Sequence, residues 1–462
     1  MPPAMTAAAT PDIKAPGVAG GFYPADPGAL AGQVSSCIKV GQRFGMAPKA
    51  LIAPHAGYLF SGTIAGTAYA NVAHLRGTVK RVVLLSPPHR MPVAKIARAT
   101  HSHWQSPLGA LPTDLAALDD LQTLPVVTTD NAPFVQEHGL EVHLPFIQQV
   151  FGPHTQVVPL LVGGATPTEV ATVLDRLWGG PETLIIISSD LSHFLDIDSA
   201  RAMDAEATAA IERLRPDALT EPQACGHHAA RGLLLAARQR GLRATNLDLR
   251  NSGDTAGTPA RVVGYGAYAF EDATTARLPD NLRSTLLDVA RKVVHAAAEQ
   301  GKPVSIQPRG LQRPMLAQRG TFVTLKHNGR LRGCIGSTQA IQPLIHDVAT
   351  NAAKSTLKDP RFAPVSKDEA ASLTLSIAIL SEQQPLPVAS EAELLDTLIP
   401  GRDGLVLRDG DKGALFLPQV WDEIPDPRQF VGRLKQKADL APEHWSPTMR
   451  CFRFVAETFG EH

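Results

Sequence analysis

The sequence of 462 residues predicts an α/β domain followed by an α+β domain. Two observations predict this order. From about residue 50 to 270, short apolar strands alternate with helical segments, which is typical of a largely parallel sheet in a three-layer sandwich. Beyond residue 280, a helix is followed by hairpin signals, which are typical of antiparallel strands.

We place the first domain at residues 17–270, a linker at 271–280 and the second domain at 281–460. Residues 1–16 are rich in Ala and Pro, and no basic segment leads into an apolar one. We therefore expect a flexible tail there and not a secretory signal.

The strands of the first domain are predicted from continuous apolar runs rich in Val, Ile and Leu. Such runs suit strands that are buried on both faces of a sheet. They lie at residues 50–53, 81–86, 156–162, 183–188 and 261–270.

Helices between these strands are predicted from their caps. Thr166 and Glu169 form a capping box with a proline between them, ahead of an apolar-periodic segment. The segments "SARAMDAEATAAIERL" and "HHAARGLLLAARQRG" predict two further helices, and Gly241 ends the second.

The second domain begins with a helical stripe of apolar residues from Leu282 to Ala297, which Gly301 ends. The segments "TFVTLKHNGRLRGCIG" and "GLVLRDGDKGALFLP" contain Asn-Gly and Asp-Gly turns, which predict two hairpins. A further strand is predicted at "LTLSIAIL".

Composition argues against several partners. Lys+Arg and Asp+Glu both number 44, so a net charge of zero gives no support to a nucleic-acid or acidic membrane partner. No apolar run approaches the roughly 20 residues that cross a bilayer. The four cysteines have neither disulfide nor zinc-finger spacing, so we expect a reduced, cytoplasmic protein.

Polar side chains follow three of the predicted strands. His55 follows the first strand, His89 the second, and Asp190 and His193 the strand at 183–188. Because ligands gather at the carboxyl ends of parallel strands, we expect these side chains to converge. A single histidine in such a place is usually a surface or structural residue, but three in matching positions favour a site.

Cys225 lies just ahead of an apolar helix, where the helix dipole favours a thiolate, the form that binds metal. Two imidazoles and one anionic group suit a divalent transition metal. The alternative is a small core cysteine. His138, Glu141 and His143 are close enough in sequence to reach one pocket, although their spacing is a weak signal, and His227 and His228 are expected on the first helical turn, facing partly outward.

Six motifs of the first half resemble the Memo family in order and spacing, over about residues 17–270. They are "GGFYPADPGAL", "APHAGYLFSG", "WQSPLGALPTD", "EHGLEVHLPF", "SSDLSHF" and the "CG" at 225–226. That family is similar in fold to the class III extradiol dioxygenases, which are non-haem iron enzymes.

The resemblance implies metal ligands at His55, His89 and Cys225. It places Asp190 and His193 beside the metal, with His193 as acid/base residue and His143 lining the pocket. Iron is the metal implied first, and copper or zinc are alternatives. The dioxygenases use a carboxylate as third ligand where this chain has Cys225, so their reaction does not follow from the fold. The residues before His89 also depart from the family pattern, which affects how that imidazole is held.

The second half resembles the AMMECR1 domain over about residues 278–458, chiefly in "LRGCIG" at 331–336. The flanking glycines suggest that backbone or ligand approaches closely. Arg332 is expected to lower the pKa of Cys334 and make it a nucleophile or redox thiol. The alternative is a buried strand cysteine in a hairpin that the glycines bend.

Proteins that resemble these two families commonly accompany a radical-SAM protein in the AmmeMemoRadiSam system, which implies such a partner here. Three functions fit the residues. The first is a metal-dependent redox protein or dioxygenase-like enzyme that acts on an unknown small molecule or protein. The others are a peptide- or ligand-binding module with the same pocket, and a zinc hydrolase with Asp190 or His193 as base.

Overall fold

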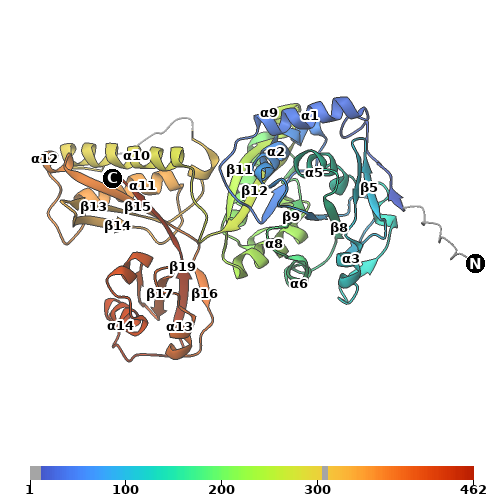
Figure 1. Cartoon of the computed structure of the whole chain (residues 1–462). Coiled ribbons are helices and arrows are strands. Elements are labelled where there is room, and N and C mark those ends of the chain that lie inside the picture. Colours follow the sequence, from blue (N-terminus) through green and yellow to red (C-terminus); the bar gives the residue numbers. More distant parts are fainter. Residues whose placement is uncertain (1–11, 304–310, 462) are drawn as a thin grey trace, which may run out of the picture. The chain divides into compact units, whose positions relative to one another are not determined.

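The computed structural model describes residues 12–303 and 311–461 (Figure 1). By its internal contacts, the chain divides into two compact units, Met1–Glu271 and Asp272–His462. Among the described residues, no helix combines the length and the apolar character that a membrane-spanning segment requires.

The structure corrects the end of the predicted tail. Residues 1–11 lie outside the described residues, but Ile13–Lys14 form strand β1, which pairs in parallel with β5 (His103–Ser106). Lys14 is buried, and its Nζ lies 3.3 Å from a carboxylate oxygen of buried Glu141. The first domain therefore begins before residue 17. The buried carboxylate of Glu141 requires a charged partner, and Lys14 supplies it.

The first unit is a mixed α/β domain with a large, parallel-rich sheet. Within the described residues, this sheet has nine strands in the order β10-β12-β2-β9-β3-β8-β4-β7, with β11 paired to β12. The four central strands are parallel, as the apolar runs predicted: β2 (Ala50–Ala53), β9 (Thr183–Ser188), β3 (Arg81–Ser86) and β8 (Gln156–Val162).

The flanking strands make the sheet mixed. β12 (Val262–Asp272) runs antiparallel to β2, and β4 (Ile96–Arg98) runs antiparallel to β8. The remaining strands of this unit are β7 (Val127–Thr129), β10 (His193–Leu195), β11 (Leu242–Asn251) and β6 (Gly109–Pro112), the last of which joins β1 and β5 in a small sheet.

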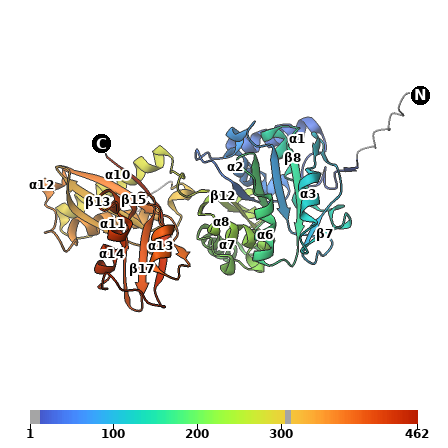
Figure 2. The same cartoon turned by 60° about the horizontal axis from the view of Figure 1, so that its bottom comes forward.

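Helices lie on both sides of the large sheet, because alternate side chains of its buried strands point to opposite faces. In Figures 1 and 2, α1 (Pro27–Val40) and α2 (Tyr58–Ala70) lie on one side, and α6 (Pro167–Leu177) and α8 (His227–Gln239) on the other. α6 begins with the predicted capping box. The other helices are α3 (Leu115–Leu121), α4 (His138–Glu141), α5 (Leu144–Phe151), α7 (Ile197–Glu212) and α9 (Ser252–Thr255).

The second unit consists of antiparallel sheets with few helices. Its first helix, α10 (Asp280–Gln300), ends at Gly301 with φ +66°. One described sheet has the order β14-β13-β15-β20 and the other β16-β19-β17-β18. Both turn-based hairpins are confirmed: β13 (Thr321–His327) with β14 (Arg330–Gly336), and β17 (Gly404–Asp409) with β18 (Lys412–Phe416).

The last strands of the chain connect these two sheets, since β19 (Arg450–Phe454) belongs to one and β20 (Ala456–Gly460) to the other. Trp421 stacks on Phe430 at a centroid distance of 3.7 Å in the core of the second sheet. The remaining elements are β15 (Leu373–Leu380), β16 (Gln384–Leu386), α11 (Leu344–Leu357), α12 (Lys367–Ala370), α13 (Glu391–Thr397) and α14 (Pro427–Lys437).

Candidate metal centre

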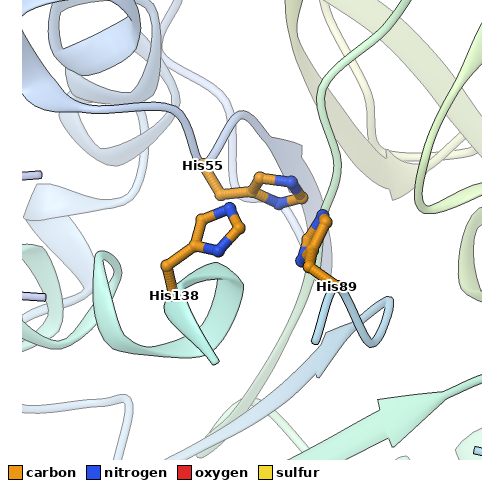
Figure 3. Close-up of side chains that lie close together, drawn as sticks. All are labelled: His55, His89 and His138. Carbon is orange, nitrogen blue, oxygen red and sulfur yellow. The ribbon is translucent and has the colours of Figure 1, made fainter. Parts of the chain in front are cut away.

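Three histidines from separate segments meet at the carboxyl end of the parallel strands. His55 follows β2, His89 follows β3, and His138 begins α4. One ring nitrogen of each lies within 4.8 Å of those of the other two. Figure 3 shows the three rings gathered around a common space. This spacing is suitable for a shared metal ion.

A buried hydrogen-bond network orients the ring of His55. Its Nδ1 lies 2.7 Å from Ser188 Oγ, at the end of β9, and Nε2 of His143 lies 3.1 Å from the same oxygen. The Ser188 hydroxyl donates its proton to the carbonyl oxygen of Gly139, at 2.5 Å. Both histidine nitrogens must therefore donate to Ser188, which leaves the Nε2 of neutral His55 with a free lone pair.

His143 stabilises this arrangement through hydrogen bonds to Ser188 and Tyr69. Because its Nε2 carries the proton, its Nδ1 accepts from the Tyr69 hydroxyl at 3.0 Å. Burial lowers the pKa of His143 to about 3, so the ring is neutral at pH 7. His143 does not line the cavity described below; it lies beneath His55, bonded to Tyr69 and Ser188, which differs from the pocket-lining place that the resemblance implied.

His89 is held by a carboxylate. Its Nδ1 lies 2.7 Å from Glu137 Oε1 and its backbone N–H donates to Oε2 at 2.6 Å. Gly139 N also donates to Oε1, at 2.8 Å. Burial acts to raise the pKa of Glu137, but these hydrogen bonds hold it below its ordinary value. A carboxylate on Nδ1 fixes the ring tautomer and leaves Nε2 as the ligand atom, as in many metal sites.

His138 is the residue that the sequence did not single out as a ligand. Its Nδ1 is buried and makes no hydrogen bond within the described part of the chain, although it lies 3.5 Å from Glu137 Oε1. Burial lowers the pKa of His138 to about 4, so its ring is neutral at pH 7. A metal ion shared with the other two imidazoles would give this buried nitrogen the partner that it lacks.

Cys225 lies where the sequence predicted it. Its sulfur is 3.3 Å from His55 Nε2 and accepts from Asp190 N at 3.3 Å. The predicted thiolate is wrong for the metal-free protein. Desolvation, reinforced by the Asp190 carboxylate, raises the pKa of the Cys225 thiol to about 12, so the charge of Asp190 and the loss of water outweigh the helix N-terminus.

Asp190 acts on the His55 backbone and not on its ring. Its Oδ1 accepts from His55 N at 2.8 Å, so it fixes the loop that carries the imidazole. Burial raises the pKa of Asp190 to about 7. Like His143, Asp190 is not among the residues that line the cavity described below.

A cavity of about 600 Å³ leads to this centre. His89, Cys225 and His193 line it, so a small molecule can reach two of the candidate ligands and the predicted acid/base residue together. Burial lowers the pKa of His193, which keeps its ring neutral. Four prolines, at positions 87, 88, 92 and 222, form much of the remaining wall.

In the second unit, the arginine beside Cys334 is not the one that the sequence predicted. Arg332 donates to both carboxylate oxygens of Glu369, at 2.5 and 2.9 Å. It is the extra residue of a bulge, since Gly333 pairs with Leu325 and Leu331 with Lys326. The guanidinium beside the cysteine is that of Arg361, whose Nη2 donates to Cys334 O at 3.2 Å.

The remaining neighbours of Cys334 are polar. The Thr324 hydroxyl lies 3.3 Å from the sulfur of Cys334, and the backbone N–H of Cys334 donates to Asp359 at 2.7 Å. A side chain at Gly333 would meet Ser355 O at 2.4 Å, so this glycine is required by the approach of the protein's own backbone. The described contacts thus explain this glycine without a ligand.

Comparison with known proteins confirms both resemblances. A family model described as Memo-like protein matches residues 14–269, and one described as AMMECR1 matches residues 287–459. A MEMO1 family protein of Methanosarcina acetivorans is 33% identical over 280 residues, covering 56% of this chain and 100% of the relative. Another, from Sulfolobus acidocaldarius, is 28% identical over 288 residues with the same coverage.

Among solved structures, an uncharacterized protein from Pyrococcus horikoshii is 32% identical and covers 38% of this chain and 90% of its own, with a TM-score of 0.36. The Memo-like model alone accounts for more than half of the sequence. This chain belongs to the Memo-like family and carries an AMMECR1 domain after its Memo-like domain.

Proposed function

We propose that the first unit is a metal-dependent redox protein whose ion is held by His55 and His89, with Cys225 and His138 as the further ligands. The observation that carries this proposal is the hydrogen bonding that the two rings have in common. Each Nδ1 is occupied by a buried oxygen, so each Nε2 is left as a lone pair at the site. Protein metal sites use the same arrangement.

The donor set suits a transition metal. Imidazole nitrogens and a cysteine sulfur favour iron, copper or zinc over magnesium or calcium, which prefer oxygen. The buried Nδ1 of His138 and the sulfur of Cys225 give an ion two further partners, which a site with two histidines alone would lack. Bound iron or copper would supply a reversible change of oxidation state at the cavity.

The protein's own groups have separate tasks in this proposal. Ser188 and Glu137 hold the two rings, and Asp190 holds the loop of His55. His193 lines the cavity as a neutral imidazole, which can take a proton from a substrate bound there.

Anaerobic purification followed by metal analysis and absorption and EPR spectra tests this function. We expect the wild type and Cys334→Ser to retain iron or copper, and Cys225→Ser and His138→Gln to lose most of it. Zinc alone in every preparation would contradict the redox function in favour of a hydrolase. A protein that takes up no metal would contradict it in favour of a ligand-binding module, which the cavity by itself would support.

We also propose that the chain acts with a radical-SAM protein. What supports this is the family resemblance, since Memo-like and AMMECR1-like proteins commonly accompany a radical-SAM protein and this chain carries both domains. Affinity purification of the full chain from its native cells should enrich a protein with a cysteine-bound iron–sulfur cluster. Enrichment equal to that of an unrelated tagged protein would refute the partnership.

A further inference from the structure

The ring of His138 lacks the hydrogen bonds that orient the other two imidazoles of the centre. Ser188 holds His55 and Glu137 holds His89, but within the described part of the chain no hydrogen bond reaches Nδ1 of His138. The ring nonetheless faces the other two (Figure 3). An imidazole without an orienting partner is free to turn, which weakens its bond to a metal ion. Another contact must therefore set its orientation.

Phe22 is the aromatic side chain that packs on this ring. The two centroids are 4.5 Å apart, and the planes are tilted by 35°. The backbone of Phe22 is itself fixed, because its carbonyl oxygen accepts from Tyr58 N at 2.8 Å. Aromatic rings at such distances prefer particular relative orientations. Contact with Phe22 therefore restricts the orientation of the His138 ring.

The same N-terminal segment, residues 13–23, also holds the short helix that carries His138. That helix, α4, ends at Glu141, which is buried. Among the described residues, all of the hydrogen bonds that its carboxylate accepts come from this segment, at 2.6 to 3.3 Å: from Lys14 Nζ, Gly17 N, Val18 N and Tyr23 Oη. A buried carboxylate is costly without such donors, so α4 and the segment dock together.

We propose that Phe22 and the N-terminal segment position His138 as a ligand of the metal centre. This inference rests on the proposed function, because it concerns the ion held there. Phe22 acts on the ring, and Glu141, through the segment, acts on the helix; both are positioning residues. Since a docked segment favours the ligand geometry, the bound ion must in turn favour the docked segment by the same factor.

Co²⁺ binding to the full chain, stripped of metal, tests this positioning. Its affinity is measured by competition with a chromophoric chelator. We expect Phe22→Ala to weaken binding about tenfold, since loss of an orienting partner typically costs about 10–100-fold. Phe22→Tyr, which keeps an aromatic ring at this place, should bind Co²⁺ as the wild type does. The matched control is Phe452→Ala, at a half-buried phenylalanine of the second unit, which should leave the affinity unchanged.

A second measurement requires no metal. Diethyl pyrocarbonate modifies neutral imidazoles, and peptide mass spectrometry of the metal-free chain gives the rate at His138 relative to exposed His74. We expect this relative rate to rise several-fold in Phe22→Ala, because the released ring gains exposure, and to stay at the wild-type value in Phe22→Tyr. Tyr23→Phe removes only the hydroxyl that bonds to Glu141 and should raise the rate less. It decides the question if Phe22→Ala does not fold.

The outcomes separate this positioning from the metal function. An unchanged rate at His138 in Phe22→Ala would overturn the proposal, because Phe22 would then act on some other group. An equal loss of Co²⁺ affinity in Phe452→Ala would also overturn it, since general destabilisation would explain both. If the wild type binds no Co²⁺, the proposed function fails, and the rate alone decides whether Phe22 positions the ring. A raised rate with unchanged affinity would support the positioning and remove His138 from the ligands.

Discussion

Glu137→Gln tests whether the carboxylate sets the geometry of the metal centre. Glu137 is 1% exposed and accepts three hydrogen bonds, two from His89 and one from Gly139. Glutamine keeps the shape but has one acceptor oxygen, so its amide N–H₂ must face at least one of these N–H groups. Hydrogen bonds to charged groups contribute about 1.5–3 kcal/mol each, and the opposed donor adds a desolvation cost. We expect the free energy of unfolding to fall by roughly 2–4 kcal/mol.

The metal affinity should fall as well. Loss of such a supporting partner typically weakens metal binding about 10–100-fold, because the ring of His89 is then free to turn or to change its tautomer. Competition with a chromophoric chelator measures the affinity, and urea denaturation monitored by tryptophan fluorescence measures stability. The matched control is Glu443→Gln, at an exposed glutamate of the second unit, for which both quantities should stay at the wild-type value.

The pH dependence of this difference has a defined sign. The folded-state pKa of Glu137 is depressed below 4.5, so its charge contributes stability above that pH and loses it as pH falls through the folded value. The difference in the free energy of unfolding between wild type and variant should therefore be largest at pH 7 and should disappear in acid. A variant that binds metal with wild-type affinity and unfolds at the wild-type urea concentration would refute the reasoning.

Three further outcomes follow from the same contacts. Ser188→Ala removes the shared acceptor of His55 and His143 and should cost about 2–4 kcal/mol in urea denaturation, since buried N–H groups lose their partner; unchanged stability would contradict the network. Cys225 is a thiol with a pKa of about 12, so ion binding should release one proton near pH 7, and the affinity for the ion should increase as pH rises. Calorimetry in buffers of different ionisation enthalpy measures the proton release, and Cys225→Ser should abolish it. Gly329→Ala, at φ +76° in the Asn-Gly turn, should lower the stability of the full chain by about 1–2 kcal/mol, and a stability gain would be evidence against the left-handed turn.

Much of the fold followed from local patterns. Apolar runs predicted the four parallel strands at their observed bounds, because a strand buried on both faces needs no polar alternation. The sequence also predicted that His55, His89 and Cys225 come near one another. A parallel sheet brings the carboxyl ends of its strands to one edge, whatever the distance along the chain.

The flanking strands were less predictable. β4, β7 and β10 have only three residues each, which is too short for a periodic signal. The two-sheet arrangement of the second unit likewise depends on strands that pair across long stretches of chain, such as β16 with β19.

The amino-acid sequence by itself determined the strand–helix order, the turns, and the edge at which two imidazoles and a sulfur meet. Only the tertiary structure decided that His138 joins this group, that Arg361 and not Arg332 accompanies Cys334, and that Cys225 keeps its proton when no metal is bound. The reason is physical. Turns and buried strands depend on neighbours in sequence, whereas a ring's orientation or a thiol's pKa depends on groups that long-range packing brings into contact and on the water that it removes.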